Sequence, residues 1–277
     1  MVSIFVTGST DGIGRQTPAT LIDAGHRVVL HARNDQRAAD AARDLPGAAR
    51  VVVGDVSILA ETRALASAAT AAGPYDVVIH NVGVGGGATT REVTADGIER
   101  IFQINVLAPY LLTALMPLPA NVIYLTSGLE ADGAIDFDDL QYRRRPWHGM
   151  RAYSDSKLCD VLLAFAVARR WPGRYSNAVD PGWIRTRLGG PDATDALPEG
   201  AETQVWLAVS DDPAAAVTGR YFKRRTDLRA NPVAYDLAAQ DRLLAACAAL
   251  TGASLPAVPL ASQPVSASAF PPVSRQA

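Results

Sequence analysis

The octapeptide Thr7-Gly8-Ser9-Thr10-Asp11-Gly12-Ile13-Gly14 decides the fold, since it joins an apolar run at 2–6 to a helical pattern that begins at residue 13. Gly8 permits a tight turn, Gly12 lets the backbone approach a phosphate, and Gly14 lets the helix pack closely on the strand. The start of the helix adds free N–H groups and the positive end of its dipole. Strand, turn and helix in this order predict a site for the pyrophosphate of a dinucleotide cofactor. Its candidate contacts are Gly8, Thr10, Asp11, Gly12, Ile13 and Gly14.

The alternation of strand and helix continues through the rest of the chain. Short runs rich in β-branched residues, mostly apolar on both sides, lie at 2–6, 27–31, 50–53, 76–80, 121–126, 175–179 and 219–222. Helical patterns lie between and after them, at 13–24, 35–45, 58–72, 94–116, 154–171, 200–209 and 234–250. Runs that are apolar on both sides indicate strands buried on both faces. The sequence therefore predicts an α/β fold with a doubly wound parallel sheet between two layers of helices.

Two stretches fall outside this pattern. No composition shift marks a linker before residue 252, so we expect a single domain over 1–251. Residues 252–277 are rich in Pro, Ala and Ser without any period, and we expect this tail to be disordered or strapped to the surface. The irregular stretch 128–150 contains Arg143-Arg144-Arg145. It is either a solvated loop, as charge runs usually are, or the rim or lid of a substrate site.

Composition excludes several classes of partner. A net charge of -2 gives no electrostatic footprint for nucleic acid or an anionic membrane, so a small molecule is the expected partner. Cys159 and Cys247 are too few for a disulfide framework, and the histidines have no metal-ligand spacing. No signal sequence or membrane-spanning run is visible, so we expect a cytoplasmic protein without a metal. The sequence does not decide between a monomer and a homo-oligomer.

The residues after the second strand bear on the choice of cofactor. An acidic residue about 20 residues beyond the glycine-rich turn would bind a ribose 2'-hydroxyl, but the sequence there is His31-Ala32-Arg33-Asn34. The guanidinium of Arg33 suits a 2'-phosphate. We therefore expect NADP(H) over NAD, although Asp35 follows closely and Arg33 could be a surface residue.

Polar residues gather at the ends of the later strands, where open α/β sheets bind their ligands. Asn81 and Gly83 follow the fourth strand, Ser127 ends the fifth, and Pro181-Gly182 opens a turn after the sixth. Tyr153 and Lys157 stand one helical turn apart, so the ammonium can favour the phenolate and make the tyrosine an acid or base near neutral pH. Such a pair alone is weak evidence, because a surface helix can carry it by chance.

Together these motifs resemble the short-chain dehydrogenase/reductase family, over about residues 2 to 225. The resemblance rests on TGxxxGIG at 7–14, Asp55-Val56, NxG at 81–83, Asn105, Ser127, YxxxK at 153–157 and PGxxxT at 181–186. The long step from Ser127 to Tyr153 resembles the retinol-dehydrogenase-like branch, and the C-terminal third is similar to daunorubicin C-13 ketoreductase-like proteins. The family implies a Rossmann fold and NADP-dependent hydride transfer between a carbonyl and an alcohol.

The resemblance also implies a role for each candidate residue. Tyr153 would be the acid/base, Lys157 would lower its pKa and bind the nicotinamide ribose, Ser127 would polarise the substrate carbonyl, and Asn105 would hold a relay water. Asp55, Val56, Asn81 and Gly83 would contact the adenosine half of the cofactor. Pro181, Gly182, Trp183 and Thr186 would lie at the nicotinamide end, although packing could explain Trp183 equally well. The competing hypotheses are a redox sensor that binds NADP without turnover and an NAD-linked alcohol dehydrogenase.

Overall fold

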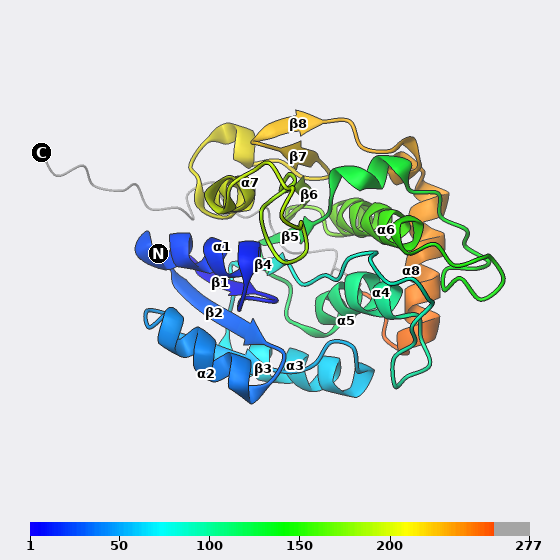
Figure 1. Cartoon of the computed structure of the whole chain (residues 1–277). Helices are drawn as coiled ribbons and strands as arrows, with labels where there is room; N and C mark the ends of the chain where they lie inside the picture. Colours follow the sequence, from blue (N-terminus) through cyan, green and yellow to red (C-terminus); the bar gives the residue numbers. More distant parts are fainter. Residues whose placement is uncertain (258–277) are drawn as a thin grey trace, which may run out of the picture.

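An eight-stranded sheet in the order β3-β2-β1-β4-β5-β6-β7-β8 runs through the molecule (Figure 1). The structure is a computed structural model and describes residues 1–257. The strands are β1 (Ser3–Val6), β2 (Arg27–Ala32), β3 (Arg50–Val53), β4 (Val77–His80), β5 (Asn121–Leu125), β6 (Tyr175–Asp180), β7 (Tyr221–Lys223) and β8 (Thr226–Leu228). All pairings up to β7 are parallel, which confirms the predicted doubly wound sheet.

Both faces of the sheet are covered by helices, as the apolar strands predict. Phe5 of β1 is paired with Val29 and Val78, and all three face α3 and α5, whereas Ile4 and Val6 face α1 and α7. Figure 1 shows α3, α5, α6 and α8 on one side and α1, α2 and α7 on the other. The helices are α1 (Gly12–Asp23), α2 (Asp35–Asp44), α3 (Leu59–Ala72), α4 (Arg100–Phe102), α5 (Ala108–Leu115), α6 (Gly149–Arg170), α7 (Leu197–Val209) and α8 (Leu237–Thr251).

The predicted helix over 94–116 is wrong at its start. Thr94 accepts the backbone N–H of Gly97, and Val93 forms a β-bridge with Glu99, so the chain turns before it becomes helical. The buried Glu99 carboxylate then caps the helix by accepting the N–H groups of Ile101 (2.8 Å) and Phe102 (2.7 Å). The helical residues of 94–116 therefore begin at Arg100, with α4.

Two further differences follow from turn chemistry. β8 was not predicted, because it is a short antiparallel return from β7 through Arg224 and Arg225, which both have positive φ angles. The catalytic-helix candidate α6 starts at Gly149, five residues before the predicted 154, because the His148 ring accepts the N–H of Arg151 and caps it. Tyr153 therefore lies inside α6, in its second turn.

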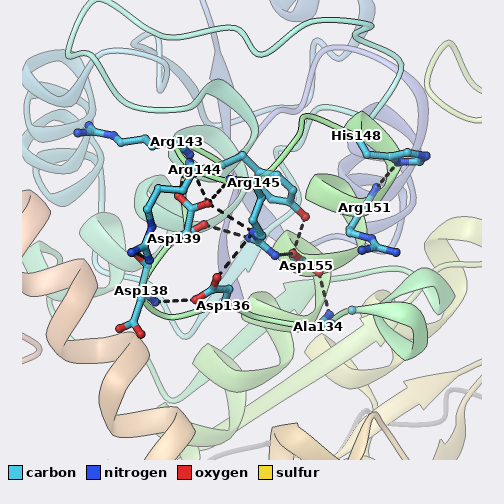
Figure 2. Close-up of polar contacts among 12 residues, drawn as sticks. Ala134, Asp136, Asp138, Asp139, Arg143, Arg144, Arg145, His148, Arg151 and Asp155 are labelled. Carbon is cyan, nitrogen blue, oxygen red and sulfur yellow. Dashed lines mark hydrogen bonds and ion pairs between the residues drawn. The ribbon is translucent and has the colours of Figure 1, made fainter.

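The stretch 128–150 is anchored to α6 by buried carboxylates (Figure 2). Asp139 accepts the backbone N–H groups of Arg143, Arg144 and Arg145 at 2.7 to 3.1 Å. These bonds keep the pKa of Asp139 below its usual value, although its burial alone would raise it. The Arg145 guanidinium lies over the Tyr142 ring at 4.0 Å and 3.6 Å from Asp155 of α6. The solvated-loop prediction therefore holds for the side chains of Arg143 and Arg144 and is wrong for Arg145.

Residues 252–257, the described part of the predicted tail, lie against the domain. Gly252 ends α8 in the left-handed conformation, and Leu255 packs on the apolar cluster between α6 and α8. The Tyr110 hydroxyl donates to the carbonyl of Ala253 at 2.8 Å, and the Trp171 indole donates to that of Pro256 at 3.2 Å. The rest of the predicted tail, 258–277, lies outside the described residues, and the domain boundary at 251 stays a prediction.

These contacts predict a difference between two truncated proteins. A chain that ends at Ala257 should unfold at the same urea concentration as the full chain. In a chain that ends at Gly252, the free energy of unfolding should fall by about 1.5 to 3 kcal/mol, because the burial of one leucine, Leu255, is lost. Equilibrium unfolding in urea of the three proteins measures this. Equal stability of the two truncated chains would show that residues 253–257 contribute nothing.

Candidate active site

The strand order reverses between β1 and β4, and the predicted cofactor residues meet at the carboxyl ends of these strands. The Asn81 amide after β4 donates to the carbonyls of Thr7 (2.9 Å) and Gly8 (3.1 Å) after β1. Gly8 and Gly12 both have positive φ, and a Cβ on Gly14 would collide with the Gly8 carbonyl. The turn thus has the glycine-dependent shape that a pyrophosphate needs, and the first turn of α1 leaves backbone donors beside it.

His31 supports this turn from β2, a role that the sequence analysis missed. Its Nδ1 accepts the N–H of Gly8 at 3.0 Å, so Nε2 carries the proton that goes to the carbonyl of Gly54 at 2.8 Å. Burial lowers the pKa of His31, which keeps the ring neutral and able to accept. The signal was a histidine in an otherwise apolar strand.

Two arginines belong to the segments predicted to bind the adenosine half of the cofactor. Arg33 is exposed directly after β2, as the prediction requires, and Arg37 of α2 donates to the Thr10 hydroxyl in the turn at 3.0 Å. Asp55 accepts both the N–H and the hydroxyl of Ser57, and the buried Val56 packs against α3. The sequence analysis missed Arg37, although a second arginine in the first turn of the helix after Arg33 was visible in the sequence.

Gly83, Asn105 and Lys157 come together from three different elements. A Cβ on Gly83 would lie 3.5 Å from both Asn105 Oδ1 and Lys157 Nζ. Asn105 lies in a π-helical turn over Gln103–Leu107, and its amide bonds the backbone of Val84 and the hydroxyl of Ser156. Single π-turns are common at functional sites, which explains an asparagine in the middle of a helix.

Lys157 is buried beside Tyr153. Its ammonium lies 5.8 Å from the centre of the Tyr153 ring and donates to the carbonyl of Leu125 at 3.0 Å and to Asp160 at 2.8 Å. Burial alone would lower the pKa of Lys157, but the nearby carboxylate of Asp160 and the phenol oxygen of Tyr153 raise it. Lys157 is therefore a charged group that can act on the phenol. Asp160 was not among the predicted residues, although a carboxylate three residues after a lysine on an apolar helix was the signal.

Ser127 caps a short 3₁₀ turn at the end of β5, where its hydroxyl accepts the N–H of Leu129 at 3.3 Å. The neighbouring Thr126 fixes the strand end to α6 by donating to the carbonyl of Lys157 at 2.6 Å. On the other side, the buried Asp180 pairs with Lys223 at 2.9 Å, and its carboxylate would lie 3.0 Å from a Cβ on Gly128. The serine thus sits on a firmly held strand end next to α6.

The segment after β6 extends across the cofactor residues. Gly182 has a positive φ, and Thr186 reaches to 3.0 Å from a Cβ on Gly12, while Leu188 approaches Gly85 after β4. Pro181 is half-buried at the start of this segment. Trp183 is exposed and donates its indole N–H to Gly189, so core packing does not account for it.

The structure therefore brings the predicted residues to one edge of the sheet in two groups. In the first group, Lys157 lies beside Tyr153 and Asn105, and the strand end that carries Ser127 is bonded to α6 through Thr126. In the second group, Asn81 and Thr186 contact the glycine-rich turn. Within residues 1–257, no three His, Cys, Asp or Glu side chains are grouped as a metal site, and no helix is long and apolar enough to span a membrane.

Comparison with known proteins gives a consistent family. The model of the short chain dehydrogenase family matches residues 3–197. The chain is 41% identical to an uncharacterized oxidoreductase of Emericella nidulans, over 92% of this chain and 99% of that one. It is 32% identical to a Streptomyces protein named as a daunorubicin C-13 ketoreductase, over 90% and 92% of the two chains. It is also 32% identical to human retinol dehydrogenase 13, over 92% and 86%.

Solved structures agree with the fold. An uncharacterized protein from Mycobacterium paratuberculosis superposes with a TM-score of 0.80 at 26% identity, covering 92% of this chain and 95% of that one. A blue fluorescent protein from a metagenomic library, in complex with NADPH, superposes with a TM-score of 0.64 at 25% identity, covering 80% and 95%. The resemblance drawn from the motifs is confirmed, and this chain belongs to the short-chain dehydrogenase family of oxidoreductases.

Proposed function

We propose that this enzyme is an NADP(H)-dependent reductase of ketones or aldehydes, acting in either direction, with Tyr153 as its acid/base. The observation that carries the proposal is the convergence of the buried Lys157 ammonium, Tyr153 and Asn105 next to Gly83. A protein that only sensed NADP would have no need for Ser127, Tyr153, Lys157 and Asn105 together. The bound cofactor would supply the hydride.

The residues of the chain supply binding and proton transfer. Ser127 donates its hydroxyl hydrogen to the substrate oxygen, and Tyr153 transfers its phenolic proton to the same oxygen as the alcohol forms. Lys157 has three N–H donors, two of which are taken by Leu125 and Asp160. The third is available to a cofactor ribose or to a water that returns the proton to Tyr153. The π-turn keeps Asn105 next to that ammonium.

The preference for NADP(H) is supported by the charges around Thr10. Arg33 is exposed directly after β2, and Arg37 already bonds the turn through Thr10, so the chain has two guanidinium groups available for the proposed adenosine end. Guanidinium groups bind phosphate in charge-assisted hydrogen bonds. No carboxylate directly follows β2, where an NAD-linked enzyme would hold the 2'-hydroxyl.

The surroundings of Tyr153 favour an apolar carbonyl compound. Leu129, Met150, Trp183 and Leu188 are exposed large apolar residues on the segments that carry Ser127, Tyr153 and Thr186. Leu129 follows Ser127 by two residues, Met150 precedes Tyr153 by almost one helical turn, and Leu188 contacts Gly85. Exposed apolar residues gathered at a site indicate an apolar ligand. We therefore expect a bulky hydrophobic ketone or aldehyde rather than a small polar one.

A substrate panel tests the proposed function. Loss of NADPH absorbance is followed with aliphatic aldehydes, cyclic ketones and aromatic polyketides, and kcat/KM is expected to rise with the apolar surface of the substrate. Tight NADPH binding with no turnover of any member would favour the sensor, whereas equal use of NADH would favour the NAD-linked alcohol dehydrogenase.

A further inference from the structure

A buried carboxylate lies directly behind the proposed catalytic lysine. Asp160 follows Lys157 on α6 at i+3, and its Oδ2 is 2.8 Å from the lysine ammonium. Neither side chain is more than 5% exposed. Asp160 is the one carboxylate paired with Lys157 in the part of the chain that the structure describes.

The charge of Lys157 depends on this partner. Burial without a counter-charge destabilises an ammonium and lowers its pKa, so the group gives up its proton more readily. The carbonyl of Leu125 accepts one hydrogen bond from Lys157 but brings no negative charge. Asp160 is thus the group that offsets the burial of Lys157, and it leaves the third N–H of the ammonium for the active site.

Asp160 in turn depends on Lys157. Its other oxygen, Oδ1, is buried and has no hydrogen-bond partner among the described residues. Burial raises the pKa of Asp160 to about 6, against the lowering effect of Lys157. The carboxylate therefore ionises around pH 6, and both members of the pair are charged above that pH.

Three other titratable groups near the pair, Cys159, Tyr124 and His80, do not change their charge around pH 6. Burial raises the pKa of Cys159 on α6 and that of Tyr124 on β5, so both stay neutral. His80 on β4 stacks on Tyr124 and bonds Thr113, and burial lowers its pKa to about 3. The Tyr153 ring, whose centre lies 5.8 Å from the Lys157 ammonium, is the group on which the proposed function requires the pair to act.

We propose that Asp160 is a positioning residue of this active site, whose carboxylate keeps Lys157 protonated and in place beside Tyr153. The inference rests on the proposed function, because it assigns the lysine a role in activating the tyrosine. Asp160 does not touch substrate or cofactor. It acts through Lys157, and its own protonation turns that support off as the pH falls.

The test is the pH profile of kcat/KM for carbonyl reduction, from about pH 5 to about pH 9. Wild-type activity should fall as the pH drops through about 6, where Asp160 takes up a proton. Asp160→Asn keeps the size and a hydrogen bond but removes the charge, so it should resemble the protonated enzyme at every pH. We expect its plateau to be roughly tenfold lower, the equivalent of about one pKa unit, and its acid limb to be absent.

Cys159→Ala is the matched control, because this residue is the buried neighbour of Asp160 on α6 and has no bond to Lys157. It should keep both the plateau and the acid limb. An Asp160→Asn profile equal to that of the wild type, or an equal loss in Cys159→Ala, would overturn the proposal. If Asp160→Asn does not fold, the wild-type profile decides: an acid limb near pH 6 supports the proposal and its absence contradicts it.

Tyr153→Phe, measured in parallel, separates the two levels of the argument. If Tyr153→Phe still turns over, the proposed function itself fails. If it is inactive while Asp160→Asn behaves as wild type, the function stands and only the role of Asp160 is lost.

Discussion

Replacing Tyr153 by phenylalanine should lower kcat for carbonyl reduction by about 10² to 10⁴-fold, the usual contribution of a positioned proton donor. The substitution removes only the phenolic hydroxyl and its proton, because the ring, which is 9% exposed, keeps its packing in α6. NADPH affinity should stay within a few-fold, because Lys157, the glycine-rich turn and the arginines are unchanged. Single-turnover kinetics and NADPH fluorescence titration measure the two quantities separately.

A second tyrosine in a polar environment provides the control for this experiment. Tyr142 donates its hydroxyl to Asp155 of α6 at 2.6 Å, two residues from Tyr153, but it belongs to the stretch anchored by Asp139. Tyr142→Phe removes the same atom from the same region and should affect stability more than kcat. A Tyr153→Phe enzyme with retained turnover, or an equal loss of kcat in Tyr142→Phe, would contradict the assignment of Tyr153 as acid/base.

The fold could be predicted because its signals are local and repeat along the chain. Most strands of the parallel sheet are apolar on both sides, and their carboxyl ends are marked by a glycine or a polar residue. Parallel pairing brings these ends to one edge, so Gly8, Asn81 and Ser127 could be assigned to one site without knowledge of their contacts. The register came from the structure, which pairs Phe5 with Val29 and Val78 and buries all three on one face.

What could not be predicted depends on contacts between residues far apart in sequence or on capping of single turns. The bond between Gly8 and His31 joins β1 to β2, and the inward turn of Arg145 depends on Asp155 in a helix that starts later. Glu99 ends the turn before α4 by a carboxylate cap that an apolar helical pattern over 94–116 hides. The pairing of Asp160 with Lys157 could have been predicted, because a lysine and a carboxylate at i and i+3 lie on one side of a helix.

The stretch 128–150 is connected to the candidate active site through α6. Asp155 bonds Tyr142 and the N–H of Ala134 from α6, and the next residue, Ser156, accepts from Asn105. Asn105 therefore contacts the same turn of α6 that fixes the loop. This arrangement gives the loop a structural connection to the π-turn and to Lys157, which its charge run alone did not indicate.

The second large effect is expected at Arg33, which is exposed directly after β2, next to the glycine-rich turn. If its guanidinium binds the 2'-phosphate, Arg33→Ala should weaken NADPH and leave NADH nearly unchanged, because NADH has no phosphate there. A charge-assisted hydrogen bond contributes about 1.5 to 3 kcal/mol, so kcat/KM for NADPH should fall by roughly one to two decades.

Arg33→Asp should go further and shift the preference toward NADH, because a carboxylate repels the phosphate and can accept from a ribose 2'-hydroxyl. Arg37→Ala is the informative comparison, since Arg37 bonds Thr10 and should lower kcat/KM for NADPH by a smaller factor if it only supports the turn. The measurement is kcat/KM with each cofactor for the wild type and the three variants. Since loss of a charge near the 2'-phosphate weakens NADPH selectively, an NADPH/NADH ratio that stays constant would identify Arg33 as a surface residue. The choice of NADP(H) would then lose its main support while the fold and the tyrosine chemistry remained untouched.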